Sequence, residues 1–489
     1  MRDGSRIVSL TTSAGRLDSI DLSTSRRRWW ALIVVVAAQF MFVVDAFIVN
    51  VAIPSIQADL RAGAAEIEAI LAVYQIAFAT LVITGGRLGD IGGRKRMFMV
   101  GVLAFSTASL WCGLAGSGVE LILGRLAQGA AAALMVPQVL ATIHTLFPDA
   151  ARGRAFAVYG TALGLGAAAG FVLGGWLVTL DVAGLGWRSV FLVNIPIGVA
   201  IALAAWRLMP ATQPQAGTQL DVAGAVVLFL GLIGVIGPVM AGHDLGWTWW
   251  LWLLMAAGGT TLMLFLRLQR AIKHQGGQPL IDPSQFTDRA FVSGLCAAFC
   301  FHLGNTSFYL VMTLFMQNGL RFSPLEGGLA VMPLALAFTL ASHIATRRQA
   351  QVGNRVLLEG TAVQFAGLLL ILLLVAIVER PGLATLMAAL TVFGVRQGLV
   401  MAPLAGVVLS SVPRIHAGAG AGLLSTATQA AGAAGISLAG AIYFAGRSVG
   451  TERDGACAAL AVLGVTIVAT AVLLIWSQRV RASQPPPAA

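Results

Sequence analysis

Long apolar runs separated by short polar stretches make up almost the whole chain. Each run covers about 20 residues or more, the length that an α-helix needs to cross the hydrocarbon core of a bilayer. The pattern therefore predicts fourteen membrane-spanning helices. The predicted spans are residues 29–53, 68–86, 97–116, 119–141, 154–180, 188–209, 221–241, 249–268, 290–317, 324–345, 356–377, 382–403, 417–444 and 456–477.

Two connections, the short polar segment 210–220 and the longest inner connection 269–289, divide these helices into groups. Six predicted helices precede the first connection and six follow the second. The sequence thus predicts an all-α integral membrane protein of two six-helix bundles with two extra helices inserted between them. The predicted parts are a tail (1–28), an N-terminal bundle (29–209), an inserted pair (221–268), a C-terminal bundle (290–477) and a second tail (478–489).

Composition supports a membrane protein and argues against a soluble one. The 489 residues are 58% hydrophobic and only 10% charged, whereas soluble domains carry about 25% charged residues. The net charge of +11 does not indicate a nucleic-acid partner, because the basic residues lie in short loops between apolar runs. The four cysteines lie in or beside apolar segments, which favours membrane packing over disulfides or a metal site.

The distribution of basic residues predicts the orientation. Twenty Lys and Arg residues fall in the connections and helix ends of one side, and six fall on the other. Because basic loops stay in the cytoplasm, we expect a multi-pass protein of the inner (cell) membrane with both termini cytoplasmic.

Among the acidic residues, only Asp45 lies well inside a predicted span. A charge in hydrocarbon costs about 2.5–3.5 kcal/mol or more, so its presence needs a reason. Asp45 lies about 13 Å and Arg125 roughly 9 Å from the outer ends of their helices, so the two can share one layer. The pair is either a proton-coupling site or a fixed structural ion pair; we favour the first, because an ion pair is an expensive way to join two helices.

Other polar side chains within the predicted spans are candidates to line a central substrate cavity. His302 lies about 18 Å from the inner face, where an imidazole either titrates or simply hydrogen-bonds a neighbouring helix; we favour the second. The predicted substrate-binding residues are Tyr74, Gln75, Gln138, His302, Asn305 and Gln429. No catalytic residue, metal site or cofactor is expected.

The most specific motif is the loop 86–96, Gly-Arg-Leu-Gly-Asp-Ile-Gly-Gly-Arg-Lys-Arg. It combines flexible glycines, one acid and several bases in a short inner loop. Asp90 can cap a helix or pair with an arginine and so lock helices at the cytoplasmic face. The residues assigned to this conformational latch are Gly86, Asp90, Gly93, Arg94 and Lys95.

These five residues match, in order, the signature that the major facilitator superfamily carries between its second and third helices. The chain also resembles the fourteen-helix drug:proton antiporter branch through segment 45–54, through Arg125-Leu-Ala-Gln128-Gly129, and through segment 187–198. The resemblance covers most of the chain and is densest in residues 40–200. It implies proton coupling at Asp45.

Two departures from that branch affect the expected substrate and mechanism. Phe171 follows Gly170 where the antiporter motif has a proline, and loss of that proline removes a bend in the helix. The segment Gly418–Gly435 keeps Gln429 but has no acidic residue. A preference for multiply charged cations is therefore not indicated, and neutral, zwitterionic or anionic substrates remain open.

We expect proton-coupled efflux of small amphipathic molecules, drugs or antibiotics, by a monomer that uses alternating access. The proton gradient is the expected energy source, because no nucleotide-binding motif is visible. A proton-coupled importer or lipid carrier of the same fold is the alternative. An integral-membrane enzyme is a remote one, because no cluster of acids, bases or metal ligands is present. Substrate identity and proton stoichiometry do not follow from the sequence.

Overall fold

The computed structural model describes residues 22–147, 149–211, 219–353, 355–410 and 417–482, and the regular elements there are helices. Thirteen of the described helical segments are long and apolar enough to cross a membrane, and α14 (Ala417–Val449) supplies a further helix of 33 residues. The structure confirms the predicted fold class. The other long helices are α1 (Leu22–Leu60), α2 (Ala64–Gly92), α3 (Arg94–Leu114), α4 (Gly118–Leu146), α5 (Asp149–Leu180), α7 (Asn194–Leu208), α8 (Val222–Leu245), α9 (Trp249–His274), α10 (Arg289–Leu314), α11 (Pro324–Val352), α12 (Arg355–Ile377), α13 (Leu383–Ser410) and α15 (Glu452–Ala482).

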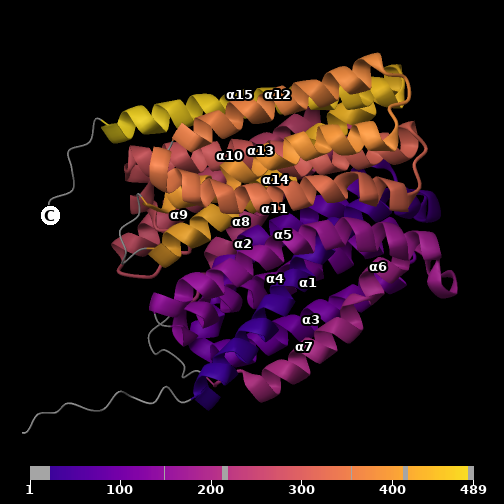
Figure 1. The fold of residues 1–489 in the computed structure, drawn as a ribbon. Helices are drawn as coiled ribbons and strands as arrows, with labels where there is room; N and C mark the ends of the chain where they lie inside the picture. The colour runs from indigo at the N-terminus through magenta and orange to yellow at the C-terminus, as the bar shows by residue number, and fades with distance from the viewer. Residues whose placement is uncertain (1–21, 148, 212–218, 354, 411–416, 483–489) are drawn as a thin grey trace, which may run out of the picture.

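The helices pack in two groups, with α1–α7 in one and α10–α15 in the other (Figure 1). The short helix α6 (Ser189–Leu192) leads directly into α7, and a π-helical turn, η4 (Phe315–Gly319), extends α10. The groups meet along two seams, one where α5 packs against α11 and one where α2 packs against α14. We call the groups the first and second bundle; their boundaries as independent units stay a prediction.

Most helices extend beyond the predicted spans, and the early starts of two of them bear on the site. Helix α1 begins at Leu22, inside the predicted tail, and α2 begins at Ala64 rather than at 68. The earlier start of α2 follows from Glu66, which accepts a hydrogen bond from the Gly63 amide and so caps the helix. As a result, Glu68 lies one turn inside a spanning helix.

We call the end of the molecule that holds the α1–α2 turn the outer end, following the predicted orientation. Here the bundles touch directly, since Gln317 of η4 donates a hydrogen bond to the Val51 carbonyl of α1 at 2.9 Å. On the α5–α11 seam, Gly175 lies so close to the backbone of Leu325 that a Cβ would clash with it. The outer ends of the two bundles are therefore closed against each other.

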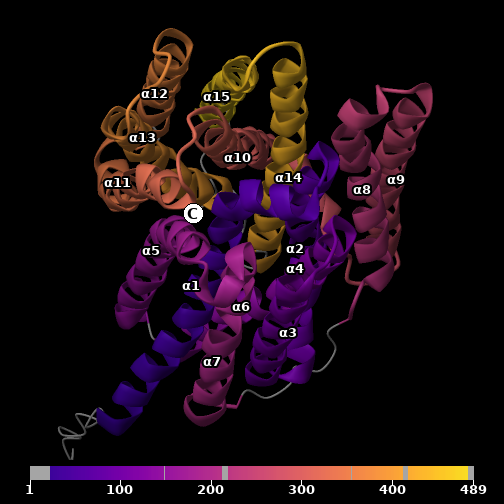
Figure 2. The ribbon, with the colours of Figure 1, turned by 90° about the vertical axis from the view of Figure 1, so that its right-hand side faces the viewer.

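Helices α8 and α9 form a pair beside α2 and α14, away from α5 and α11 (Figure 2). Asp221 caps α8 and also accepts hydrogen bonds from Gln269 of α9 and from the Leu280 amide. Arg87 of α2 donates to the carbonyls of Gln219 and Pro279, on either side of the pair. These contacts fix the inserted pair to the first bundle.

Candidate functional site

Asp45 and Arg125 form an ion pair in the middle of the first bundle. Nη1 of Arg125 lies 2.7 Å from Oδ2 of Asp45, and the two side chains are 1% and 0% exposed. The sequence placed both residues at a common depth, and the structure brings them into direct contact. The pair joins α1 to α4 inside the bundle rather than at the seams.

Two side-chain amides complete the hydrogen bonding of the Asp45 carboxylate, and one hydroxyl accepts from both amides. Oδ1 of Asp45 accepts from Gln128 at 2.9 Å and from Asn194 at 2.8 Å. Both amides also contact the hydroxyl of Ser109, and Gln128 accepts from Arg125 at 2.8 Å. The network thus gathers α1, α3, α4 and α7 around one carboxylate, in the way that buried ions require.

Tyr74 belongs to this network rather than to an open cavity. Its ring lies under the Arg125 guanidinium, with 4.1 Å between Cζ and the ring centroid, and the side chain is 2% exposed. Arg125 also donates to the carbonyl of Ile70, which lies on α2 one turn before Tyr74. The cation–π contact and this hydrogen bond hold the arginine over the carboxylate.

The latch residues lie at the inner end of the first bundle. Asp90 accepts from Arg94 at 3.3 Å, and Arg94 reaches the Ala141 carbonyl of α4. Lys95 donates to the Trp206 carbonyl of α7 at 2.7 Å. Gly93 takes a φ of 86°, which favours glycine, where α2 turns into α3, and Gly86 lies opposite Pro137 of α4. The contacts described here tie α2 and α3 to helices of their own bundle.

The other predicted substrate-binding residues are dispersed. Gln138 is buried within the first bundle and donates to the Gly85 carbonyl. His302 is half-buried, and its Nδ1 lies 2.9 Å from the Ala298 carbonyl of its own helix. Gln75 of α2 lies against Gly432 of α14. Gln429 is half-buried and lies about one turn from Gly432 on α14. The structure thus brings Gln75 and Gln429 to one seam and leaves the others elsewhere.

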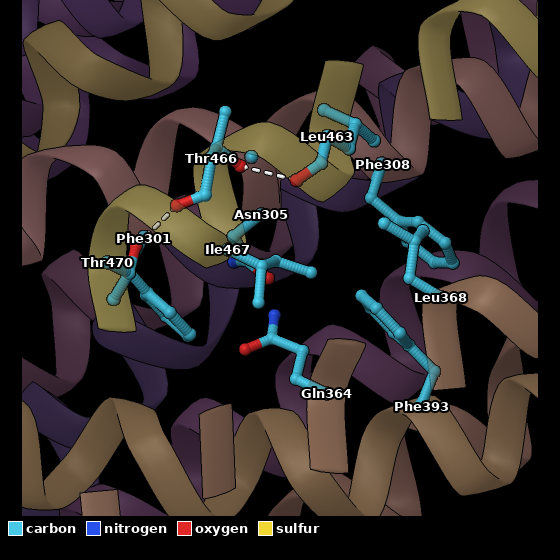
Figure 3. A pocket seen from close by; sticks show the side chains of 11 residues that line it. Phe301, Asn305, Phe308, Gln364, Leu368, Phe393, Leu463, Thr466, Ile467 and Thr470 are labelled. Carbon is cyan, nitrogen blue, oxygen red and sulfur yellow. Dashed lines mark hydrogen bonds between the residues drawn. The ribbon is translucent and has the colours of Figure 1, made fainter. Parts of the chain in front are cut away.

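Asn305 lines a small cavity inside the second bundle, between α10, α12, α13 and α15 (Figure 3). Its side-chain oxygen and that of Gln364 are buried without hydrogen-bond partners, and Figure 3 shows both amides pointing into the same space. The cavity holds about 10 Å³, which suits roughly one water molecule. It is too small for a drug-sized molecule.

An aromatic cluster that sequence reasoning missed lies between the bundles. Phe47 of α1, Phe171 of α5 and Tyr309 of α10 contact one another in tilted and edge-to-face arrangements, with ring centroids 5.2–5.3 Å apart. Phe171 is the residue that replaces the motif proline. Tyr309 also donates to Gln397 of α13. The only sequence signal was the departure at Phe171, which gave no hint of its partners.

A second buried acid contradicts the expectation that Asp45 alone lies deep in a span. Glu68 of α2 is 0% exposed, and neither carboxylate oxygen has a hydrogen-bond partner among the described residues. The prediction was wrong here because the apolar run was taken to begin at residue 68, which placed the carboxylate at the membrane boundary.

The helical architecture and the buried ion pair define a polytopic membrane transporter. The family model described as Major Facilitator Superfamily matches residues 35–436, and the chain belongs to this family. Membership implies a small-molecule substrate and a lipid bilayer as surroundings.

Several curated proteins resemble this chain over most of its length. A probable actinorhodin transporter of Streptomyces coelicolor is 36% identical over 86% of this chain and 73% of its own. The puromycin resistance protein pur8 of Streptomyces alboniger is 33% identical over 84% of this chain and 81% of its own. The multidrug resistance protein Stp of Mycobacterium tuberculosis is 28% identical over 84% and 75%.

Among solved structures, a bacterial homologue of the human lysosomal transporter Spinster, inward-facing and unoccupied, superposes with a TM-score of 0.68. It is 15% identical, and the match covers 94% of this chain and 99% of that one. At this identity the match supports the shared fold alone.

Proposed function

We propose that the protein exports small amphipathic molecules, antibiotics among them, in exchange for protons. The observation that carries the proposal is the Asp45–Arg125 pair, in which a buried carboxylate of α1 accepts from three side chains of α4 and α7. Similarity to the actinorhodin, puromycin and multidrug resistance proteins supports the direction of transport and the class of substrate.

Asp45 carries the exchanged proton by alternating between two forms. As a carboxylate it holds Arg125 and the two amides, as it does with the outer end closed. Proton uptake removes the charge that Arg125 compensates, so the pair weakens and α1 and α4 are free to shift relative to each other. Substrate release to the outside and proton uptake then share the outward-open state.

The substrate path runs between the bundles, along the α2–α14 and α5–α11 seams. Gln75 and Gln429 supply polar contacts at the first of these. The ring cluster of Phe47, Phe171 and Tyr309 closes the path toward the outer end. This mixture of rings and neutral amides suits an amphipathic molecule without a high positive charge.

The remaining parts of the proposal concern the setting. The protein acts as a monomer in the cell membrane with both termini in the cytoplasm, and it moves its substrate without converting it chemically. The loop around Asp90 and Arg94 holds the inner ends of α2, α3 and α4 together, so that the first bundle rocks as one body.

The test is substrate-driven proton movement in proteoliposomes, with puromycin and tetracenomycin C as probes. In the wild type, protons should move in the direction opposite to the drug. Asp45→Asn, which keeps the size of the side chain, should abolish this exchange. Glu359→Gln is the matched control, since that carboxylate is half exposed and pairs with Arg348 on the surface. Drug movement that ignores the pH gradient, or an active Asp45→Asn variant, contradicts proton antiport through Asp45.

A further inference from the structure

Glu68 occupies the outer part of the α2–α14 seam. It lies on the second turn of α2, and its carboxylate faces Gly440 of α14. A Cβ at position 440 would come within 2.5 Å of the Glu68 Oε1 atom, so glycine leaves just enough room for the acid. The side chain is sealed by the contact between the two bundles, with no exposed surface.

No cation neutralises this acid in the described part of the chain. Helix α8 brings another acid, Asp244, which accepts from the Ala65 amide. On α2 itself, Glu66 is a further acid, and it accepts from the Gly63 amide. On α4, Glu120 accepts from the Gly116 amide.

The arginines of α4 and α14 that the structure describes are paired with other acids. Arg447 of α14 pairs with Glu452 of α15 at 3.2 Å, and Arg125 of α4 pairs with Asp45. Arg61, in the turn between α1 and α2, is exposed to solvent. The charged groups of α3 lie at its inner end, at residues 94–96.

A carboxylate ion in such surroundings is strongly disfavoured, whereas the neutral acid costs far less to bury. The closed seam therefore selects the protonated form of Glu68. When α2 and α14 separate at the outer end, water reaches the side chain, and an ordinary glutamic acid in water is ionised near neutral pH. Closing the seam again requires the carboxylate to take up one proton from the outer solution.

We propose that Glu68 is a proton-binding site of the outer gate and that its protonation is required for α2 and α14 to close. The proton comes from the outside and returns there, so Glu68 senses outer pH and sets the closed fraction without contributing net transport. This role rests on the proposed alternating-access function but is separate from the exchanged proton, which belongs to Asp45.

The experiment measures the outer-end distance by spin labelling in nanodiscs, where both faces see one pH and no substrate is needed. Labels go on Val119→Cys and Val449→Cys, two exposed positions at the outer ends of α4 and α14. Cys296, Cys300 and Cys457 are replaced, and Cys112 is kept because it is buried. Antiport is not measured, so failure of the Asp45 mechanism does not affect the result.

In Asp45→Asn, which removes the opposite pH dependence of the proposed exchange site, the ratio of closed to open protein should fall between pH 5 and pH 9, by up to tenfold per pH unit for one linked proton. Glu68→Gln added to Asp45→Asn keeps the shape but cannot ionise, and this protein should stay closed with a ratio that is constant within about twofold. The pH dependence should persist when Asp244→Asn, the matched acid control, is added to Asp45→Asn. If Glu68→Gln elutes as misfolded protein, Glu68→Met replaces it.

Two outcomes overturn the proposal. The first is a distance that does not depend on pH in Asp45→Asn. The second is an Asp45→Asn, Glu68→Gln double variant that opens with pH as Asp45→Asn does, and loss of the dependence on adding Asp244→Asn would then identify Asp244 as the responsible acid.

Discussion

Two fully buried acids lie within membrane-spanning helices in the part of the chain that the structure describes, and their surroundings are opposite. Asp45 lies inside the first bundle and accepts from Arg125, Gln128 and Asn194. Glu68 lies between the bundles and accepts from nothing in the described part of the chain. The same chemical group is thus fully compensated at one place and uncompensated at the other.

The difference teaches which protonation state each place selects. The Asp45 network stabilises a charge, so adding a proton disturbs it. The Glu68 surroundings exclude a charge, so losing a proton disturbs them. In this outer-closed arrangement we infer that Asp45 is ionised and Glu68 is neutral, which assigns them different roles in one cycle.

The sharpest way to break the comparison is to make Asp45 resemble Glu68. Arg125→Met leaves the Asp45 carboxylate without its cation, and we expect a loss of about 3–5 kcal/mol of stability, because breaking one partner of a buried pair leaves an isolated charge. Thermal unfolding of the purified protein measures it. Arg188→Met, which breaks the partly exposed pair with Asp59, should cost less than about 1 kcal/mol.

A double variant tests whether charge rather than packing explains that loss. Asp45→Leu combined with Arg125→Met removes both charges and should recover much of the stability, while remaining unable to exchange protons. A double variant as unstable as Arg125→Met would mean that the pair matters through its shape.

The second prediction enlarges the neighbour of Glu68. Gly440→Ala places a methyl group against the carboxylate and should shift the seam toward the outer-open state by about 1–3 kcal/mol, the usual cost of overpacking. Spin-label distances at the outer end measure the shift. Gly406→Ala is the control, because a Cβ there meets nothing within 4 Å; an equal effect of both changes would show that the Glu68 contact is not special.

The third prediction concerns the aromatic cluster between the two bundles. Phe171→Leu removes the ring contacts with Phe47 and Tyr309, and the outer-closed state should lose about 1 kcal/mol. The same labels measure it. Phe98→Leu, a change at a buried phenylalanine of α3, should lower stability without opening the outer end. If the closed fraction is the same in wild type and Phe171→Leu, the aromatic cluster does not stabilise the outer-closed state.

The smallest effect is expected at a third acid, Asp282, which lies outside the membrane-spanning segments. Partial burial raises the pKa of its carboxyl, but hydrogen bonds from Lys273 and Ser284 outweigh burial and leave the pKa below its ordinary value. Its stabilising contribution is thus complete above the unfolded pKa of about 3.9 and is lost as pH falls through the lower folded pKa.

Because Lys273 is substantially exposed, solvent screening limits the Asp282 effect to less than about 1 kcal/mol. Unfolding midpoints of Asp282→Asn and wild type, compared at pH 7 and pH 3, measure it. The difference in unfolding midpoint between the two proteins should be smaller at pH 3 than at pH 7. A larger difference at pH 3 would contradict a lowered pKa of Asp282.

Hydrophobic length and helical rise account for the features that the sequence predicted correctly. The span pattern predicted the all-helical fold, and helical rise put Asp45 and Arg125 in a common layer, because both inferences need only the sequence of a single helix. The direct contact between the two residues came from the structure. Asn194 was visible only as part of a family motif. Ser109 had no signal, since a serine within an apolar run is commonplace.

The features that the sequence could not reveal depend on contacts between distant helices. Glu68 stood at the edge of an apolar run, and only the packing of α14 over α2 makes it buried. Phe171 stood out as a missing proline, and its role appears once Phe47 and Tyr309 meet it from other helices. Asn305 was expected at a substrate cavity, yet α12 and α15 enclose it within the second bundle.

The hydrogen bonds from Arg87 to the segments that flank α8 and α9 affect which seam a lipid-soluble molecule can reach. These contacts place the pair in front of the α2–α14 seam, while the α5–α11 seam, on the far side in Figure 2, has no such cover among the described helices. The two seams therefore face different neighbours, protein at one and hydrocarbon at the other. A molecule dissolved in the bilayer therefore reaches the α5–α11 seam directly and the α2–α14 seam only past α8 and α9. The inserted helices thus make the two lateral faces of the transporter unequal toward lipid.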